Sequence, residues 1–401
     1  MTNRPVVVVT NVFGPLNRGD FELFEQLVEL LDDCNVHAIA RDPAGAAVHF
    51  PGVSFHLQPG IVSERRGRLG QAMAVLRTSA LMLSPFLAVM QKVLPKEQRE
   101  ALKVIDSADL VIACPGGYLT NATHSFYPQV AQVFAASRKA KRFWLAPMSI
   151  GPAHTFFEKA LLRAALSNAR AVYVRETWSQ NFCTSLEIDS ILSSDLAFLP
   201  TRRYADGLNE QTKDCITATV VRWNFPDSSN VDEAINNYHH AMAVALDRAS
   251  QRHQLPVKLL LQVDNDREVS ERVAGLMRAP TEIVRVETPE EYRQILSRAA
   301  VMFASRFHSA VFAMCVRTPT VVISYLPKGR YMMEDMGLAE FVVDIEDVSA
   351  ERLETISLKI ESADSGYRTQ VRRALTSLIS DEKNPFVEGL RVLLLEIRRE
   401  G

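Results

Sequence analysis

The sequence predicts an α/β protein made of two Rossmann-like domains that face each other across a cleft. Apolar runs of strand length alternate with stretches of helical period through most of the chain, which is typical of parallel βαβ units. At 401 residues the chain is too long for one core of ordinary size. The apolar period is lost at Leu199–Glu210, where turn and charged residues collect. We therefore expect domains at 1–200 and 201–401.

In the first half, short apolar runs rich in valine, isoleucine and alanine predict buried strands. They are Val6–Thr10, Val36–Ala40, Leu110–Ala113, Phe143–Ala146 and Ala171–Val174. Helical periods follow several of these runs, for example over Asp20–Leu31 and Phe156–Ser167.

A second series of strands follows the expected linker. Its members are Cys215–Val221, Val257–Val263, Ile283–Val286, Ala300–Phe303 and Thr320–Ser324. The last helix, expected over Pro385–Arg399, is long enough to cross back to the first domain.

Composition excludes several classes of protein. The formal net charge of −2 gives no reason to expect nucleic-acid binding, so any basic site is local. The cysteines are scattered and odd in number, which favours reduced thiols over a disulfide framework or a zinc site: Cys34, Cys114, Cys183, Cys215 and Cys315. The apolar run after Pro5 is too short for a signal peptide, so a cytoplasmic location is expected.

A helical insertion is expected at about 61–103. A basic cluster, Arg65, Arg66 and Arg68, precedes an apolar, helix-like run over Ala72–Leu94. Arg77, Pro85 and Lys92 interrupt this run, so it does not supply the ~20 apolar residues of a membrane span. Two interpretations remain: 64–94 lies at the inner face of a membrane as a peripheral contact, or it is a hairpin packed on the domain. We favour the packed hairpin.

A candidate anion site lies where two neighbouring strands end. Ser305 is a favoured N-cap residue, which would place Arg306 and His308 in the first turn of a helix, where backbone N–H groups attract anions. The next strand leads to Lys328. Ligands of open α/β sheets bind at the carboxyl ends of strands. The pattern therefore predicts a pocket for a small, multiply charged anion, against the alternative of a structural ion pair and a core histidine.

Loops after the first-half strands carry further candidates. Asp20 ends the first loop and can cap the following helix, while Gly116 and Gly117 allow close approach of a ligand or a special turn. Arg175 and Glu176 follow another strand, either as a functional pair or as a surface ion pair.

The order of these motifs resembles that of the polysaccharide pyruvyl transferase family. The motifs are Asn17-x-Gly19-Asp20, Gly116-Gly117 with Leu119, Ser149-Ile-Gly-Pro152, Arg175-Glu-x-x-Ser179, Asp195-Leu-Ala-Phe198 and Arg306-Phe-His-Ser309 with Tyr325, Lys328, Gly337 and Leu338. The sequence departs from the family pattern at Tyr118, Glu176, Leu196, Phe307 and Arg317. The larger Tyr118 and Arg317 bear on the shape of the acceptor side.

The resemblance implies a GT-B-like fold and transfer of a pyruvyl group from phosphoenolpyruvate to two hydroxyls of a sugar, with release of phosphate. The acceptor is a saccharide, polysaccharide or lipid-linked sugar bound to the N-terminal domain, and the donor binds to the C-terminal domain. Phosphoenolpyruvate is a donor substrate, and no cofactor or metal is expected. The donor-binding positions are Arg175, Arg306, His308 and Lys328.

Roles within the site are hypotheses. Lys328 would stabilise the leaving phosphate, and His308 would either bind phosphate or supply a proton. Candidates for the base are Asp20, Glu176 and Asp195, and further substrate contacts are assigned to Asn17, Gly116, Gly117 and Asp195. Aromatic candidates for sugar stacking are Tyr118, His124 and Trp223.

Two rival functions remain open. The first is a nucleotide-sugar-dependent GT-B glycosyltransferase, since fold does not fix function. Two glutamate pairs, Glu282/Glu290 and Glu346/Glu354, have the spacing found in some retaining members, although a glutamate-rich chain gives this spacing by chance. The second rival is a non-catalytic, membrane-surface protein of envelope assembly, suggested by the basic cluster and the apolar run after it.

Overall fold

The computed structural model describes residues 4–13, 17–60, 67–121, 125–204, 212–362, 366–379 and 384–400. The chain forms two compact units. The first comprises Met1–Pro15, Asp20–Leu196 and Asp381–Gly401, and the second comprises Leu16–Gly19 and Ala197–Ser380. His124, Arg65 and Arg66 lie outside the described residues, as does the second half of the expected linker, 205–210.

The first unit is built on a parallel sheet with the strand order β3-β2-β1-β4-β6-β7-β8, and β5 pairs with β6 off this path. The central strands are buried along their length because helices cover the sheet, which explains their continuous apolar runs. The strands are β1 Val6–Val12, β2 Asn35–Ala40, β3 Ser54–Leu57, β4 Leu110–Ala113, β5 Gly116–Leu119, β6 Phe143–Ile150, β7 Ala171–Val174 and β8 Ile191–Leu192.

Some helices of the first unit begin at an N-cap side chain that accepts from the first helical turn. Helix α6, for example, starts with a capping box in which Thr155 Oγ1 accepts from Glu158 N at 3.1 Å and Glu158 Oε2 accepts from Thr155 N at 3.0 Å. The helices are α1 Arg18–Glu29, α2 Pro43–Ala47, α3 Gly67–Leu83, the 3-10 helix η1 Ala88–Val93, α4 Lys96–Ser107, α5 Phe126–Lys139, α6 Phe156–Leu166, α7 Thr177–Ser185 and α15 Pro385–Glu400.

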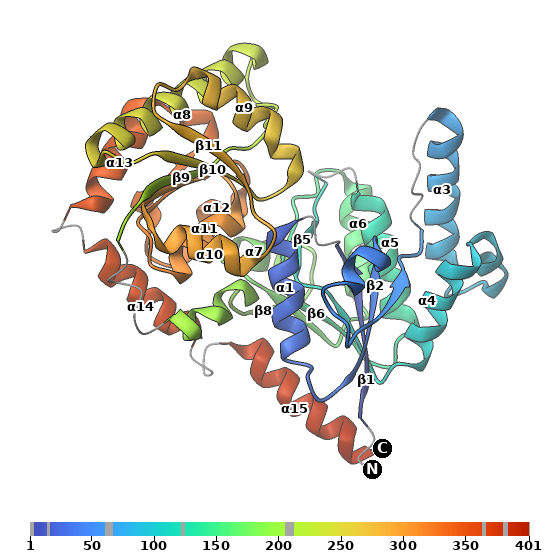
Figure 1. Cartoon of the computed structure of the whole chain (residues 1–401). Coiled ribbons are helices and arrows are strands. Elements are labelled where there is room, and N and C mark those ends of the chain that lie inside the picture. Colours follow the sequence, from blue (N-terminus) through green and yellow to red (C-terminus); the bar gives the residue numbers. More distant parts are fainter. Residues whose placement is uncertain are drawn as a thin grey trace. The chain divides into compact units, whose positions relative to one another are not determined.

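The second unit has its own parallel sheet, ordered β11-β10-β9-β12-β13-β14. Helices α8, α9 and α13 lie on one face of this sheet and α10, α11 and α12 on the other (Figure 1). The strands are β9 Cys215–Thr219, β10 Val257–Leu261, β11 Thr281–Arg285, β12 Ala299–Ala304, β13 Thr320–Ser324 and β14 Val342–Asp344.

The helices of the second unit mostly follow its strands as crossovers. They are α8 Val231–His253, α9 Arg267–Leu276, α10 Pro289–Ser297, α11 Phe307–Cys315, α12 Pro327–Asp335, α13 Ala350–Glu361 and α14 Tyr367–Ile379. The 3-10 turns are η2 Leu196–Tyr204, η4 Asp264–Asp266, η5 Ala339–Phe341 and η6 Ile345–Asp347.

The structure corrects several local expectations. Gly116 and Gly117 were expected in a loop but lie in strand β5, where Gly116 pairs with Met148. The apolar run over Ala72–Leu94, for which a hairpin was favoured, forms two helical segments, because α3 ends at Leu83 before a turn that contains Pro85. Pro85 lacks the N–H that would continue the helix, which accounts for the break.

Helix α15 (Figure 1) belongs to the first unit, where Phe386 and Gly389 lie against Tyr173 of β7 and Gly389 also lies against Trp144 of β6. Side chains of a strand alternate between the two faces of a sheet, so Trp144 and Tyr173 face α15 while Leu145 and Val172 face the main core. The Phe386 ring lies 5.2 Å from that of Tyr173 in an edge-on contact. Ser193 Oγ donates to Asn384 Oδ1 at 2.8 Å, which fixes the start of the helix.

This packing gives a stability prediction. Phe386 is 0% exposed, so Phe386→Ala leaves a cavity against Tyr173 and is expected to lower the free energy of unfolding by ~3–5 kcal/mol. Val392 on the same helix is 52% exposed, and Val392→Ala is the matched control with a change within ~0.5 kcal/mol. Chemical denaturation measures both; equal losses would show that α15 does not contribute through this face.

Candidate functional site

At the carboxyl edge of the first sheet, Arg175 sits between two carboxylates. Its side chain is 1% exposed and follows β7 directly. Nη1 donates to Asp195 Oδ2 at 2.6 Å, Nε donates to Ser149 Oγ at 2.9 Å, and Nε lies 3.6 Å from Glu176 Oε2. Arg175, Glu176 and Asp195 therefore form one buried, charge-coupled cluster.

Two of the sequence motifs interlock through Glu176. Its carboxylate accepts from Ser149 Oγ at 3.1 Å and from the Ser179 hydroxyl, and Ser179 Oγ accepts from Ile150 N at 2.9 Å. The Ser149-Ile-Gly-Pro motif after β6 and the Arg175-Glu-x-x-Ser motif after β7 thus hold each other in place. The sequence signal was the motif order alone, since Ser149 and Glu176 are far apart in the chain.

Asp20 faces the glycine strand of the same unit. A methyl group placed on Gly116 would lie 3.9 Å from Asp20 Oδ1 and 3.1 Å from the Tyr118 ring. Burial and the nearby Asp20 charge raise the pKa of the Cys114 thiol well above its usual range. Because Met148 of β6 pairs with Gly116 on one side and Val174 of β7 on the other, Asp20 and the Arg175 cluster belong to one sheet edge.

In the second unit, Arg306 is held by a carboxylate that the sequence did not single out. Its Nε donates to Asp266 Oδ2 at 2.9 Å and its Nη2 donates to Asp266 Oδ1, a bidentate pair. Burial by itself lowers the pKa of the guanidinium, but Tyr325 and Asp266 outweigh it and raise the pKa. Arg306 therefore remains cationic and has a fixed plane.

Arg306 is the N-cap of α11, not a residue of its first turn. Ser305 was expected to cap the helix, but its hydroxyl lies 2.9 Å from Tyr238 Oη and is engaged there. The backbone N–H groups of Ser305 and Arg306 donate to Thr219 Oγ1 at 3.1 and 3.2 Å. Helix α11 therefore begins at Phe307, with His308 as its second residue.

Arg306 and Lys328 line one hollow at the carboxyl ends of β12 and β13. Lys328 was expected at a strand end and lies at the second position of α12, with Nζ 5.5 Å from the centre of the Phe307 ring. The amino ends of α11 and α12 both reach this hollow, which adds two partial positive charges to two side-chain cations. Its volume of about 10 Å³ admits roughly one water-sized group.

His308 lies against the N-terminal segment that belongs to the second unit. Its side chain is buried, and a methyl group on Gly19 would lie 2.0 Å from His308 Nδ1. Only a glycine permits this approach. Asn17 Oδ1 accepts from Gly19 N at 3.1 Å, which shapes the turn that presents Gly19. The Asn17-x-Gly19 motif is therefore explained by the fit against the imidazole.

Arg18 anchors this segment and was missed in the sequence, where it lies between two motif residues. It is 2% exposed, its Nη1 lies 3.9 Å from Asp264 Oδ1, and its Nη2 lies 3.6 Å from Glu287 Oε2. The long side chain spans from the motif to β11 and its following loop.

A second hollow, of about 110 Å³, lies after β9 and was also missed. It is lined by Arg222, Trp223, His239, Asn265, Glu268 and Arg272, among others. Trp223 connects it to the first hollow, because its ring lies 5.2 Å from that of Tyr325. Burial, followed by the Arg272 charge, lowers the pKa of His239, which keeps this imidazole neutral at pH 7. The sequence pointed to this hollow only through Trp223, which follows a strand and was named as an aromatic candidate for sugar stacking.

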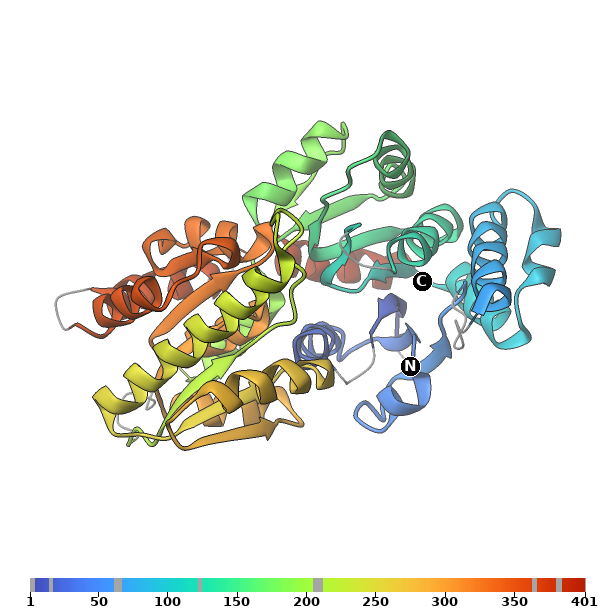
Figure 2. The ribbon, with the colours of Figure 1, turned by 90° about the horizontal axis from the view of Figure 1, so that it is seen from above.

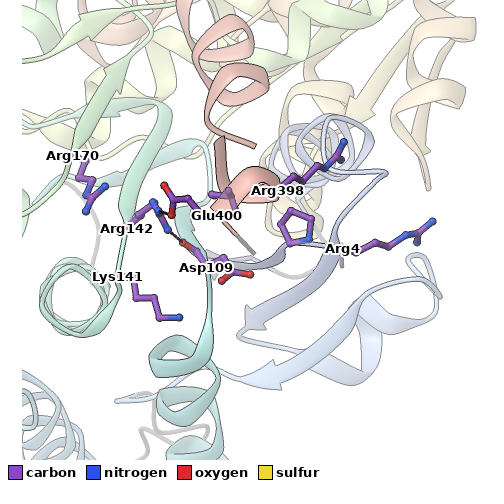
Figure 3. A pocket seen from close by; sticks show the side chains of 9 residues that line it. Arg4, Asp109, Lys141, Arg142, Arg170, Arg398 and Glu400 are labelled. Carbon is purple, nitrogen blue, oxygen red and sulfur yellow. Dashed lines mark hydrogen bonds and ion pairs between the residues drawn. The ribbon is translucent and has the colours of Figure 1, made fainter. Parts of the chain in front are cut away.

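A larger basic hollow of about 400 Å³ lies at the amino ends of the first-sheet strands (Figure 3). Its cations are Arg4, Lys141, Arg142, Arg170 and Arg398, and Arg142 donates to Glu400 and to the Asp109 carbonyl. Because α/β sheets bind substrates at the opposite, carboxyl edge, we do not assign catalysis to it. Within the described ranges, no group of three or more His, Cys, Asp or Glu residues is placed to hold a metal ion.

Solved structures with a similar arrangement of elements show the fold. A UDP-GlcNAc 2-epimerase from Neisseria meningitidis bound to UDP-GlcNAc is 10% identical, covers 98% of this chain and 100% of its own, and has a TM-score of 0.55. The structure of S. aureus MnaA with UDP is 11% identical, covers 96% of this chain and 97% of its own, and has a TM-score of 0.59. A glycosyltransferase from Rickettsia africae is 13% identical, covers 99% of this chain and 98% of its own, and has a TM-score of 0.53. The chain therefore has a GT-B-like fold.

A sequence profile of the polysaccharide pyruvyl transferase family matches residues 52–327, well over half of the chain. The protein belongs to this family of transferases. No individually curated protein matches the sequence. The expected family membership and fold class are both confirmed, while the roles of the individual site residues stay predictions.

The first site prediction concerns the Arg175 cluster. Asp195→Ala leaves the buried Arg175 charge with fewer compensating oxygens, so a loss of ~3–5 kcal/mol in unfolding free energy is expected. The matched control is Glu187→Ala, which removes an exposed arginine partner in the same unit and is expected to cost less than ~1 kcal/mol. Chemical denaturation compares them. Equal, small losses would mean that the cluster is not structurally coupled.

The second prediction concerns Gly19. Gly19→Ala drives a methyl group into the His308 ring and is expected to destabilise the protein by ~1–3 kcal/mol. In a His308→Ala background this loss should largely disappear, because the clashing ring is gone. Gly275→Ala, at a helical glycine with open space around it, is the control and should be neutral or slightly stabilising. An unchanged loss in the His308→Ala background would refute the contact.

Proposed function

We propose that the protein transfers the pyruvyl group of phosphoenolpyruvate to two hydroxyls of one sugar, forming a cyclic ketal and releasing phosphate. Family membership supports pyruvyl transfer to a saccharide. The observation that carries the choice of donor is the convergence of two helix N-termini and two cationic side chains at the Arg306–Lys328 hollow. The hollow itself, of about 10 Å³, takes one oxygen of an anionic group, and the rest of the donor lies outside it. Phosphoenolpyruvate combines a phosphate and a carboxylate, and such anions are bound by this combination of groups.

The reaction needs a proton at the methylene carbon, a nucleophilic oxygen at the central carbon, and a stabilised leaving phosphate. The first sugar hydroxyl adds to the central carbon while the methylene becomes a methyl group. The second hydroxyl then replaces phosphate and closes the ketal, and each hydroxyl loses its proton. One molecule of phosphoenolpyruvate and one diol therefore give one ketal and one phosphate.

In this proposal Lys328 and the α12 N-terminus hold the departing phosphate, and Arg306 orients the donor. Asp266 fixes the guanidinium of Arg306 through two hydrogen bonds, so the arginine meets the donor in one orientation. His308 is buried beside Gly19 and is assigned to proton transfer at the methylene carbon.

The acceptor is assigned to the first unit, at the edge that carries Asp20, Gly116 and Gly117. Glu176 and Asp195 are both buried and bonded to neighbouring hydroxyl or guanidinium groups. Asp20 is only partly buried, so it is the carboxylate of the three that a sugar hydroxyl reaches. We therefore assign the base to Asp20, and to Arg175 the positioning of Glu176 and Asp195.

The proposal requires neither a metal nor an organic cofactor, because side-chain cations and helix N-termini supply the positive charge. Treatment with a chelator is expected to leave phosphate release unchanged. We further propose that the reaction takes place in the cytoplasm, where the donor is made. No helix in the described part of the chain is long and apolar enough to cross a bilayer.

Lys328→Gln tests the donor site. Removing the charge is expected to reduce the rate of phosphate release from phosphoenolpyruvate by roughly 10²–10³-fold, because the developing phosphate charge loses a partner. Lys359→Gln is a matched control: this lysine also lies over an aromatic ring, at 5.9 Å from Phe341, on the exposed surface of the same unit. The Lys359→Gln variant should release phosphate at the wild-type rate.

The same assay separates the rival nucleotide-sugar glycosyltransferase. Saccharide acceptors are supplied with phosphoenolpyruvate or with UDP- or GDP-sugars, and phosphate and nucleotide release are measured in parallel. Release of nucleotide without any response to phosphoenolpyruvate would contradict the proposal. Equal activity of Lys328→Gln and Lys359→Gln would contradict the assignment of the hollow.

A further inference from the structure

The hairpin formed by α3 and η1 exposes a concentrated apolar surface. Of the 18 large apolar side chains that are exposed in the described part of the chain, six come from the short stretch Val75–Val89. We call them the hairpin surface: Val75, Leu76, Leu83, Phe86, Leu87 and Val89. Their exposed fractions run from 43% at Leu83 to 69% at Val75. Concentrated exposed apolar groups of this kind mark interaction sites.

The exposed positions of α3 fall on one face of the helix. Ala72, Leu76, Ser79 and Leu83 are spaced as i, i+4, i+7 and i+11 and are all exposed. Leu81, on the opposite side, is 0% exposed. The outward face of α3, formed by these four residues, therefore has no acidic or basic side chain.

The hairpin is fixed to the unit by its inner side, where Leu81 belongs to the main hydrophobic core. At the edge of the hairpin surface, the Phe86 ring lies 6.1 Å from that of Phe134 in α5, and the Arg138 guanidinium lies 5.9 Å from the centre of the Phe86 ring. Helix α3 packs against α5, and both views show it as a further layer outside the helices that cover the sheet (Figures 1 and 2). The inner side is thus already occupied, and the hairpin surface points outward.

The segment that forms the hairpin carries basic side chains and no acidic ones. From Gly67 to Lys96 the sequence has four basic residues, Arg68, Arg77, Lys92 and Lys96, and no acidic residue. The chain as a whole carries a formal charge of −2, so this excess is local. An apolar face beside basic residues and without acidic ones matches a membrane surface that contains anionic lipids.

We propose that the hairpin surface docks the protein on an anionic membrane surface. A second copy of the chain fits the same apolar face less well, because a symmetric contact would bring together two copies of the segment 67–96, which has basic residues and no acidic ones. The contact is peripheral, with the apolar side chains at the level of the lipid headgroups and the upper acyl chains.

This docking also narrows the acceptor class. An enzyme held on a membrane meets a lipid-linked saccharide at a high local concentration, so we assign the acceptor to sugars carried on a lipid. This second step rests on the proposed function, whereas the docking itself does not. Binding to vesicles that contain no acceptor therefore tests the surface independently of turnover.

The experiment compares two matched pairs of substitutions in the full-length protein. The test variant is Leu87→Gln/Val89→Gln, whose side chains are 51% and 60% exposed. The control variant is Leu395→Gln/Val392→Gln on α15, with the same residue types and both side chains 52% exposed. Co-sedimentation is measured with phosphatidylcholine vesicles and with vesicles that also contain phosphatidylglycerol, at low and high salt.

Wild-type protein and the control variant are expected to bind the phosphatidylglycerol vesicles, more weakly at high salt. The test variant should bind them roughly tenfold less, because two anchoring side chains are lost. Phosphoenolpyruvate-induced thermal stabilisation should be the same in all three proteins, which shows that the fold and the donor site are intact.

Three results would overturn the proposal: no binding of wild-type protein to phosphatidylglycerol vesicles, equal binding of both variants, or a wild-type dimer that dissociates only in the test variant. The last result would assign the hairpin surface to a second copy. Failure of phosphoenolpyruvate to stabilise any of the proteins would count against the proposed function and not against the docking.

Discussion

The convergence of two helix N-termini on one hollow is the constraint on which the proposed site depends. Parallel strands with helical crossovers bring every strand-to-helix loop to the same edge of the sheet. In the second unit this places the starts of α11 and α12 side by side, with Arg306 and Lys328 at them. The backbone thus supplies part of the positive potential, and the side chains add charge that a carboxylate or phosphate can meet.

Each of the three site arginines Arg18, Arg175 and Arg306, which are buried or partly buried, lies near an acidic residue. Arg306 is held by Asp266, Arg175 lies between Asp195 and Glu176, and Arg18 is near Asp264 and Glu287. A buried cation without such a partner would be costly. The pairs fix the guanidinium groups in one orientation, and they also explain how a chain of nearly neutral net charge holds several cations at its strand ends.

Periodicity and strand-end position predicted much of the fold and several candidate residues. The strands Leu110–Ala113, Ala171–Val174 and Thr320–Ser324 were predicted with the observed bounds, because continuous apolar runs leave little choice. Strand β5 was missed because two glycines have little propensity for strands. In the structure, pairing with β6 outweighs this low propensity. Asp266 was missed because its partner, Arg306, is distant in the sequence. The sequence could not predict whether the apolar face of the hairpin is buried or exposed, since a helix with a buried apolar face and one with an exposed apolar face have the same helical period.

The central claim is that the pyruvyl group of phosphoenolpyruvate reaches a sugar. The most direct measurement follows phosphoenolpyruvate labelled with ¹³C at its central carbon by NMR in the presence of the protein and saccharide acceptors. The account predicts that the label appears in a ketal carbon bonded to two oxygens of one sugar, with phosphate released in equal amount. Label that remains in phosphoenolpyruvate or appears as free pyruvate, while a nucleotide-sugar donor glycosylates the same acceptors, would contradict it.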